Sequence, residues 1–248
     1  MSVVEPVAHA LAARLLPLLD LTSLGEDDTP ARIEAMCTRA LGSGLPAAVC
    51  IYPEHITTAR RALGDSAVKI ATVVNFPDGG SDAQRVERET RRALAAGADE
   101  IDLVLPWAAL QGGDPGCARA VVLAARTACG NTHCLKLILE TGQLTPAQIH
   151  AASELGIQAG VDFLKTSTGK VAVNATVEAA TIMLEVIAAH GGRCGFKAAG
   201  GIRSLADAAL YLDLARDRLG DEWVTPGHFR IGASALYDAL LPLLARPA

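Results

Sequence analysis

The chain has 248 residues, of which half are hydrophobic, a fifth are charged and only 4% are aromatic, and its net charge at pH 7 is −5. This length is enough to bury a large core, and the composition is typical of an α/β protein whose core is built from Ala, Val, Leu and Ile. The negative charge and the lack of any Lys/Arg run exclude the basic surface that nucleic acids require. A small phosphorylated ligand remains compatible with this composition, because it needs only one local group of donors.

The N-terminus and the six cysteines indicate the compartment. Residues 1–16 lack the basic start, apolar run and cleavage site of a signal peptide, and no segment approaches the length of a membrane span. No two cysteines have the spacing of a metal-binding motif, so we expect buried free thiols in a reducing compartment. The sequence therefore predicts a cytoplasmic protein with no metal and no membrane partner.

Short apolar runs alternate with segments of helical period along the whole chain. Eight runs are candidate strands, near residues 15–21, 47–53, 68–77, 100–106, 133–140, 161–167, 194–200 and 229–234. One helical segment between them is expected to begin after the caps Ser81 and Asp82 and to end at Gly97. Another has Thr145 as its N-cap, Pro146 at the first helical position and Gly160 past its end.

Eight strand–helix units in about 250 residues predict a (β/α)8, or TIM, barrel of parallel strands. An open doubly wound sheet is the alternative, but the GxGxxG motif that usually follows its first strand is absent. No linker or change of composition divides the chain. We therefore expect a single domain over residues 1–248, with the barrel itself at about 15–245.

Charged residues interrupt four of the predicted strands. Because alternate side chains of a barrel strand point inward, and the apolar neighbours pack best against the helices, four of these residues should point into the barrel: Asp102, Lys136, Lys165 and Lys197. One carboxylate cannot neutralise three ammonium groups, and burying an unpaired charge is unfavourable. For any single lysine, a buried salt bridge or an amine that reaches the barrel mouth is the alternative.

Lys165 lies on the middle of the three lysine-bearing strands, so we expect its amine to be the easiest to deprotonate. A neutral amine is the nucleophile that forms a Schiff base with a carbonyl, and neighbouring cations are one way to obtain it. Lys197 would then be the activating cation or a proton shuttle. Asp102 would orient the lysines and relay protons.

Glycine-rich turns follow the sixth, seventh and eighth predicted strands. They read STGK, AGGIRS and IGASAL, and each is expected immediately before a helix. Helix N-termini bind anions, and the loops after strands seven and eight of such barrels often hold phosphate. Tight turns without a ligand are the alternative. The predicted phosphate site contains Gly169, Lys170, Gly200, Gly201, Arg203, Gly232 and Ser234.

Other polar residues sit near the same ends of the strands. Asp20 and Thr22 could both face inward at the mouth of the first strand, although Asp20 could equally cap the following turn. Cys50 is most simply a packed thiol. Asn75 and Glu140 end two strands, where they could be hydrogen-bond partners of the site or structural residues.

Eight motifs in chain order closely resemble the successive strands of the deoxyribose-phosphate aldolases, from about Leu18 to Leu236. They are LDLT, VCIYP, ATVVNFP, GADEIDLVLP, LKLILETG, DFLKTSTGKVAVNAT, GFKAAGGIRS and RIGAS. The resemblance implies a class I aldolase with a TIM barrel that needs no metal or cofactor. Such enzymes reversibly cleave 2-deoxy-D-ribose 5-phosphate into acetaldehyde and D-glyceraldehyde 3-phosphate during deoxyribose catabolism.

The resemblance also implies individual roles. Lys165 would be the Schiff-base lysine, Lys197 the lysine that perturbs it, and Asp102 the proton-relay carboxylate. Cys50 matches a cysteine that reactive aldehydes modify in some members, and a homodimer is expected. Substrate contacts or network roles would fall to Asp20, Thr22, Lys136 and Thr168, and phosphate binding to the seven residues of the predicted phosphate site.

The chain departs from the family pattern at three places. Ala198 stands where many members have proline, Ala235 stands where many have a second phosphate-binding serine, and the C-terminus LLARPA lacks the terminal tyrosine of some members. Two other functions stay open from the residues alone. One is an aldolase or isomerase of the same barrel type acting on another sugar phosphate, and the other is a carrier of pyridoxal phosphate.

Overall fold

A computed structural model of the protein describes residues 4–42 and 44–245. Eight parallel strands pair in chain order and close into a barrel through the pairing of β1 with β8. This closure confirms the predicted (β/α)8 barrel and rules out the open sheet. The strands are β1 Leu19–Ser23, β2 Ala48–Ile51, β3 Lys69–Val74, β4 Glu100–Val104, β5 Cys134–Ile138, β6 Phe163–Lys165, β7 Gly195–Ala199 and β8 Phe229–Ala233.

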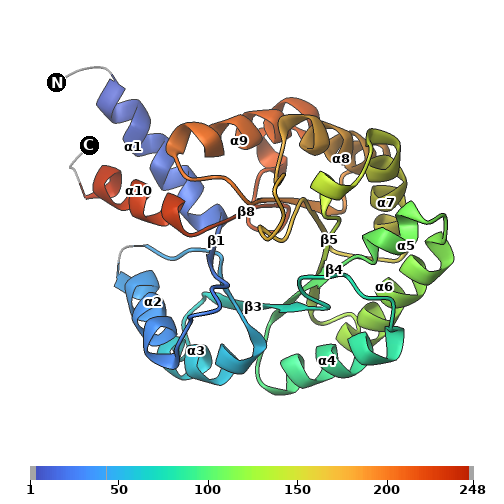
Figure 1. The fold of residues 1–248 in the computed structure, drawn as a ribbon. Coiled ribbons are helices and arrows are strands. Elements are labelled where there is room, and N and C mark those ends of the chain that lie inside the picture. The colour runs from blue at the N-terminus through green and yellow to red at the C-terminus, as the bar shows by residue number, and fades with distance from the viewer. Residues whose placement is uncertain (1–3, 43, 246–248) are drawn as a thin grey trace.

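Helices surround the strands as an outer ring (Figure 1). α1 precedes the first strand and packs beside α10, so the two ends of the described chain meet on one side of the barrel. The helices are α1 Val4–Leu15, α2 Pro30–Gly42, α3 Ile56–Leu63, α4 Ala83–Ala95, α5 Trp107–Gln111, α6 Pro115–Cys129, α7 Pro146–Gln158, α8 Val177–Ala189, α9 Leu205–Leu219 and α10 Ala235–Leu244.

The first strand begins later than its apolar run indicates. α1 ends at Leu15, and Leu16–Leu18 form a 3-10 turn before β1 begins at Leu19. Pro17 accounts for the difference, because it has no N–H to donate to a neighbouring strand but is tolerated in the first turn of a helix. The prediction that strand structure starts near residue 15 is therefore wrong by about one turn.

The predicted helix ends are confirmed. The Asp82 side chain accepts a hydrogen bond from the Arg85 N–H at the start of α4, at 2.9 Å. α7 begins with a capping box in which the side chains of Thr145 and Gln148 each accept from the other residue's backbone N–H. Gly160 follows α7 with a φ of 79°, a conformation that favours glycine.

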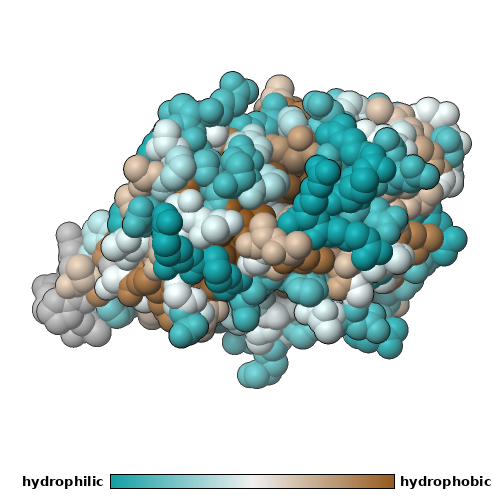
Figure 2. Space-filling model, turned by 90° about the horizontal axis from the view of Figure 1, so that it is seen from below, coloured by the Kyte–Doolittle hydropathy of each residue, from teal (hydrophilic) through white to brown (hydrophobic). Residues whose placement is uncertain are grey.

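Apolar side chains of the strands fill the layer between barrel and helices. Ile101 and Leu103 of β4 belong to this large core, as their alternation predicts. The face of the molecule seen in Figure 2 is largely hydrophilic, with apolar residues visible between polar side chains. A separate cluster is formed by small apolar residues of β2 and β3: Ala48, Cys50, Ala71 and Val73.

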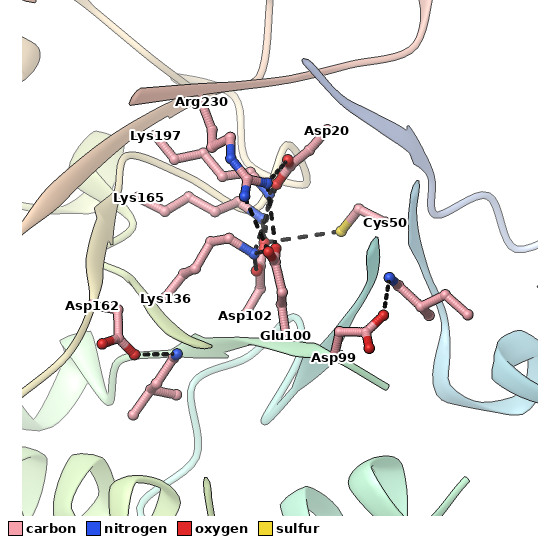
Figure 3. A network of polar contacts seen from close by, with 12 residues as sticks. Asp20, Cys50, Asp99, Glu100, Asp102, Lys136, Asp162, Lys165, Lys197 and Arg230 are labelled. Atoms are coloured by element: carbon pink, nitrogen blue, oxygen red, sulfur yellow. Dashed lines mark hydrogen bonds and ion pairs between the residues drawn. The ribbon is translucent and has the colours of Figure 1, made fainter. Parts of the chain in front are cut away.

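Two aspartates link neighbouring strands by hydrogen bonds at the amino-terminal end of the barrel. Asp99 precedes β4 and accepts the Ile70 N–H of β3 at 2.8 Å, while Asp162 precedes β6 and accepts the Leu135 N–H of β5 at 2.7 Å (Figure 3). Each carboxylate also pairs with an arginine of a neighbouring helix at 2.7 Å. The repeated contact fixes this end of the barrel and leaves the carboxyl ends of the strands available for a site.

Within residues 4–42 and 44–245, no helix combines the length and the apolar character that crossing a bilayer demands. All six cysteines are free, and four of them are buried.

Candidate active site

Four cationic and three anionic side chains converge inside the barrel (Figure 3). They come from six of the eight strands, and each is at most 6% exposed. We call them the charged cluster: Asp20, Glu100, Asp102, Lys136, Lys165, Lys197 and Arg230. The predicted inward direction of Asp102 and of the three strand lysines is confirmed.

Asp102 on β4 is the centre of the charged cluster. Its Oδ2 accepts hydrogen bonds from the Nζ atoms of Lys165 and Lys197, both at 2.8 Å, and its Oδ1 accepts from Lys136 at 2.9 Å. Burial alone would raise the pKa of Asp102, but the three lysine charges outweigh it and hold the pKa well below its usual range. Asp102 is therefore an ionised acceptor shared by two neighbouring amines.

Lys197 on β7 also pairs with Asp20 on β1, at 2.5 Å. Burial disfavours its charge, but Asp102 and Asp20 prevail and raise the pKa of Lys197. The pKa of Asp20 is lowered, because Lys197 and Arg230 offset the effect of burial. Lys197 thus keeps a positive charge within bonding distance of the oxygen that also binds Lys165.

Glu100 and Arg230 complete the charged cluster, and the sequence analysis did not identify either. Glu100 accepts from Lys136 at 2.5 Å and from Arg230 at 3.1 Å, and Arg230 also pairs with Asp20 at 2.6 Å. The alternation of side chains along each strand points to both residues. Glu100 lies two residues before Asp102 and so shares its face, and Arg230 lies between two large apolar residues as the strand lysines do.

The charge balance differs from the expected one. The sequence analysis set one carboxylate against three lysines, whereas the structure sets three carboxylates against four cations. The charged cluster thus carries one excess positive charge when every group is ionised, and the loss of one proton would balance it. Lys165 contacts one carboxylate, while Lys136 and Lys197 each contact at least two.

A cavity of about 260 Å³ opens at the carboxyl ends of the strands. Lys165 is the one member of the charged cluster that lines it. All seven residues of the predicted phosphate site line the same cavity, together with Thr22 and Thr168. The buried amine of Lys165 and a glycine-rich wall therefore line one and the same cavity.

The glycine-rich wall contains three residues with positive φ angles. Gly169, Gly200 and Gly201 have φ values of 82°, 89° and 84°, a region of backbone conformation that favours glycine. A side chain at Gly200 would also lie 2.7 Å from Asn174 Cβ. One expectation fails here: α8 begins only at Val177, so the STGK turn does not directly precede a helix.

The N-terminus of α10 is the helix end that meets the cavity directly. Ser234 immediately precedes α10, and its hydroxyl makes no capping hydrogen bond. By contrast, the first turn of α9 is already capped, because Asp207 accepts the N–H groups of Arg203 and Ser204. Lys170 and Leu24 both line the cavity, and the Lys170 ammonium donates to the Leu24 carbonyl at 2.7 Å.

Gly232 on β8 creates the space in which Lys197 lies. A Cβ atom at Gly232 would be 3.0 Å from Lys197 Cε and 3.1 Å from Ala199 Cβ, closer than ordinary contact distances. The absence of a side chain at Gly232 therefore helps to set the position of the Lys197 amine.

The remaining predicted residues belong to the charged cluster or lie beside it, and none of them lines the cavity. Asp20 and Lys136 are fully buried in ion pairs. Cys50 is also fully buried, and its thiol lies 3.9 Å from Asp102 Oδ2. Burial raises the pKa of the Cys50 thiol, so it remains protonated at neutral pH. Within the described residues, no group of three or more His, Cys, Asp or Glu side chains is arranged to hold a metal ion.

A TIM barrel with a buried lysine amine beside a glycine-rich cavity, at the carboxyl ends of its strands, has the architecture typical of an enzyme. Comparison with known proteins gives the family. The chain belongs to the DeoC/LacD family of aldolases, whose model matches residues 15–239.

Individual relatives agree with that assignment. The chain is 50% identical to the deoxyribose-phosphate aldolase of Agrobacterium fabrum over 94% of this chain and 92% of the relative. It is similar to the crystal structure of a provisionally named deoxyribose-phosphate aldolase from Coccidioides immitis, with a TM-score of 0.82 at 29% identity, over 93% of this chain and 85% of that one. The deoxyribose phosphate aldolase of Aeropyrum pernix shares the fold, with a TM-score of 0.74 at 23% identity and 97% coverage of both chains.

Proposed function

We propose that this protein reversibly cleaves 2-deoxy-D-ribose 5-phosphate into acetaldehyde and D-glyceraldehyde 3-phosphate, through a Schiff base on Lys165. One observation carries the proposal: Lys165 alone in the charged cluster lines the cavity that Gly169, Gly200 and Gly201 also line. An amine at one end and an anion cup at the other suit a sugar with a carbonyl at C1 and a phosphate at C5.

In the proposed reaction, the neutral Lys165 amine adds to C1 of the open-chain sugar, and loss of water gives a protonated imine. The C3 hydroxyl then loses its proton, the C2–C3 bond breaks, and its electron pair moves into the imine to form an enamine. C3 becomes the aldehyde of D-glyceraldehyde 3-phosphate. Protonation of the enamine at C2 and hydrolysis release acetaldehyde and restore the amine.

The charged cluster supplies the protons that these steps move. Lys197 and Lys165 hydrogen-bond to the same oxygen of Asp102, so a proton can pass between the two amines through one carboxylate. Lys136 and Arg230 hold the other carboxylates of the charged cluster in place. At the other end, Lys170, Ser234 and the glycine N–H groups bind the phosphate.

Borohydride reduction in the presence of acetaldehyde tests the Schiff base. We expect a two-carbon adduct on Lys165 after mass mapping, and neither adduct nor cleavage in Lys165→Ala. An adduct on Lys136 or Lys197 instead would contradict the assignment.

A parallel assay follows the release of acetaldehyde from 2-deoxy-D-ribose 5-phosphate, and activity confined to fructose 1,6-bisphosphate would select a different aldolase. A visible aldimine absorption band in the purified protein would instead favour the carrier of pyridoxal phosphate.

We assign the reaction to deoxyribose breakdown in the cytoplasm. Six free cysteines, four of them buried, suit a reducing compartment. A gene deletion should make cells accumulate 2-deoxy-D-ribose 5-phosphate when they are fed deoxyribonucleosides, and unchanged levels would contradict the assignment.

A further inference from the structure

Glu140, directly after β5, has an unusual conformation next to the cavity. It is 1% exposed, and its backbone lies in the left-handed region, with φ 58° and ψ 56°, which residues other than glycine rarely adopt. Its Oε2 accepts the Thr168 hydroxyl at 2.5 Å, and its Oε1 accepts the Thr168 N–H at 3.2 Å. A buried carboxylate thus holds one cavity residue by two hydrogen bonds.

These contacts determine what the Thr168 hydroxyl can still do. A hydroxyl has one proton to donate and two positions that accept. The proton is directed at Glu140, and one accepting position takes the Lys170 N–H at 3.0 Å. Because Thr168 lines the cavity, its remaining capacity toward a ligand is to accept one hydrogen bond.

The backbone ties Glu140 to the strand that carries the Schiff-base lysine. The N–H groups on either side of it, those of Leu139 and Thr141, donate to the carbonyls of Lys165 and Thr166, both at 2.9 Å. The carboxylate is therefore fixed relative to Lys165 at one end and to the Lys170 loop at the other.

We infer that Glu140 is a positioning residue, which fixes the Thr168 hydroxyl as a hydrogen-bond acceptor for a substrate hydroxyl located between the reacting carbonyl and the phosphate. The inference rests on the proposed aldol reaction, because D-glyceraldehyde 3-phosphate has one such hydroxyl, on the carbon next to its aldehyde. In Glu140→Gln the amide can donate to Thr168, so the threonine proton would turn toward the cavity and the accepting role would be lost.

The test compares two acceptors in condensation with acetaldehyde: D-glyceraldehyde 3-phosphate and 3-oxopropyl phosphate, which lacks the hydroxyl. In the wild type we expect kcat/KM to favour the hydroxylated acceptor by at least about tenfold, because its hydroxyl donates to a buried acceptor. Glu140→Gln and Thr168→Val should each reduce this ratio by at least about fivefold, and the double variant should reduce it no further. Thr168→Ser, which keeps the hydroxyl, should retain the ratio.

Trapping of acetaldehyde on Lys165 needs no acceptor hydroxyl, so the preference for the hydroxylated acceptor is compared after the rates of each variant are scaled to its own trapping rate. Glu154→Gln on α7 serves as the matched control, because Glu154 pairs with His190 at the end of α8 and does not line the cavity, and its preference between the two acceptors should match that of the wild type. Equal losses for both acceptors in Glu140→Gln, or additive losses in the double variant, would overturn the inference. Failure of the wild type to trap acetaldehyde or to condense either acceptor would instead overturn the proposed aldol function.

Discussion

The ammonium group of Lys197 controls the charge balance around Lys165. With Lys197 present, the charged cluster can lose one proton and become neutral. In Lys197→Met the cluster has three cations and three carboxylates, so loss of any proton from it would leave a buried negative charge uncompensated. Because Lys197 and Lys165 share Asp102 Oδ2, we expect acetaldehyde trapping to slow and the cleavage rate to fall by about 10²–10⁴-fold.

Borohydride trapping between about pH 6 and 10 measures the first effect, and acetaldehyde release measures the second. Lys69→Met is the matched control, because Lys69 is exposed at the start of β3 and lies outside the charged cluster. A trapping profile in Lys197→Met that coincides with that of the wild type would contradict this account of the charge balance.

Gly232→Ala tests whether the position of the Lys197 amine matters apart from its charge. The added methyl group would lie 3.0 Å from Lys197 Cε, and Lys197 is held by ion pairs with Asp20 and Asp102, so it cannot turn away freely. We expect cleavage to slow by about tenfold or more in the acetaldehyde-release assay. Gly227→Ala is the control, since its methyl group meets only an ordinary contact at 3.6 Å. Equal rates for Gly232→Ala and the wild type would contradict the expectation.

At the level of the elements, the sequence predicts well which side chains of a strand point into the barrel, but it does not predict which residues form ion pairs with them. The apolar neighbours of Asp102, Lys136 and Lys197 correctly predict that these groups point inward, because the side-chain period of a strand is two. Their partners come from distant strands. Asp20 and Arg230 are 210 residues apart, so only closure of the barrel shows that they meet.

Backbone conformation sets a second limit on what the sequence predicts. Glycine at positions 169, 200 and 201 is a direct signal for positive φ. Asn75 and Glu140 adopt the same left-handed region without that signal, because hydrogen bonds from the surrounding structure hold them there. The STGK loop was likewise expected to lead directly into a helix, whereas the α8 cap, Thr176, lies six residues after Lys170.

The capping box of Thr145 and Gln148 stabilises the start of α7. Thr145→Ala removes the side-chain acceptor for the Gln148 N–H, and we expect it to lower the free energy of unfolding by about 1 kcal/mol in urea titrations. Cleavage activity measured under native conditions should change little, because Thr145 is exposed and outside the cavity. Thr181→Ala inside α8 is the control and should not destabilise, since alanine favours helix interiors. Equal stabilities of Thr145→Ala and the wild type would contradict the role of the cap.

The molecule as a whole should lose stability at alkaline pH, because its buried thiols keep their protons only while the chain is folded. Burial raises the pKa of both Cys37 and Cys129 to about 11, whereas a thiol in the unfolded chain loses its proton near pH ~8.5. A raised folded-state pKa contributes stability that is fully present below about pH 8.5 and is lost as the pH rises toward 11. Lys136 and Lys197 act in the same direction above about pH 10.4, because their pKa values are also raised in the folded state.

Urea unfolding from about pH 7 to 10 measures this loss. Each thiol that holds its proton only in the folded state should lower the free energy of unfolding by about 1.4 kcal/mol per pH unit above its unfolded-state pKa. Cys37→Val keeps an apolar side chain of similar size at a fully buried position but removes one titrating group. The free energy of unfolding of Cys37→Val should therefore fall less steeply with pH than that of the wild type, by the contribution of one thiol. A flat wild-type profile between about pH 8.5 and 10, or an identical slope in Cys37→Val, would show that the buried thiols do not set the alkaline limit.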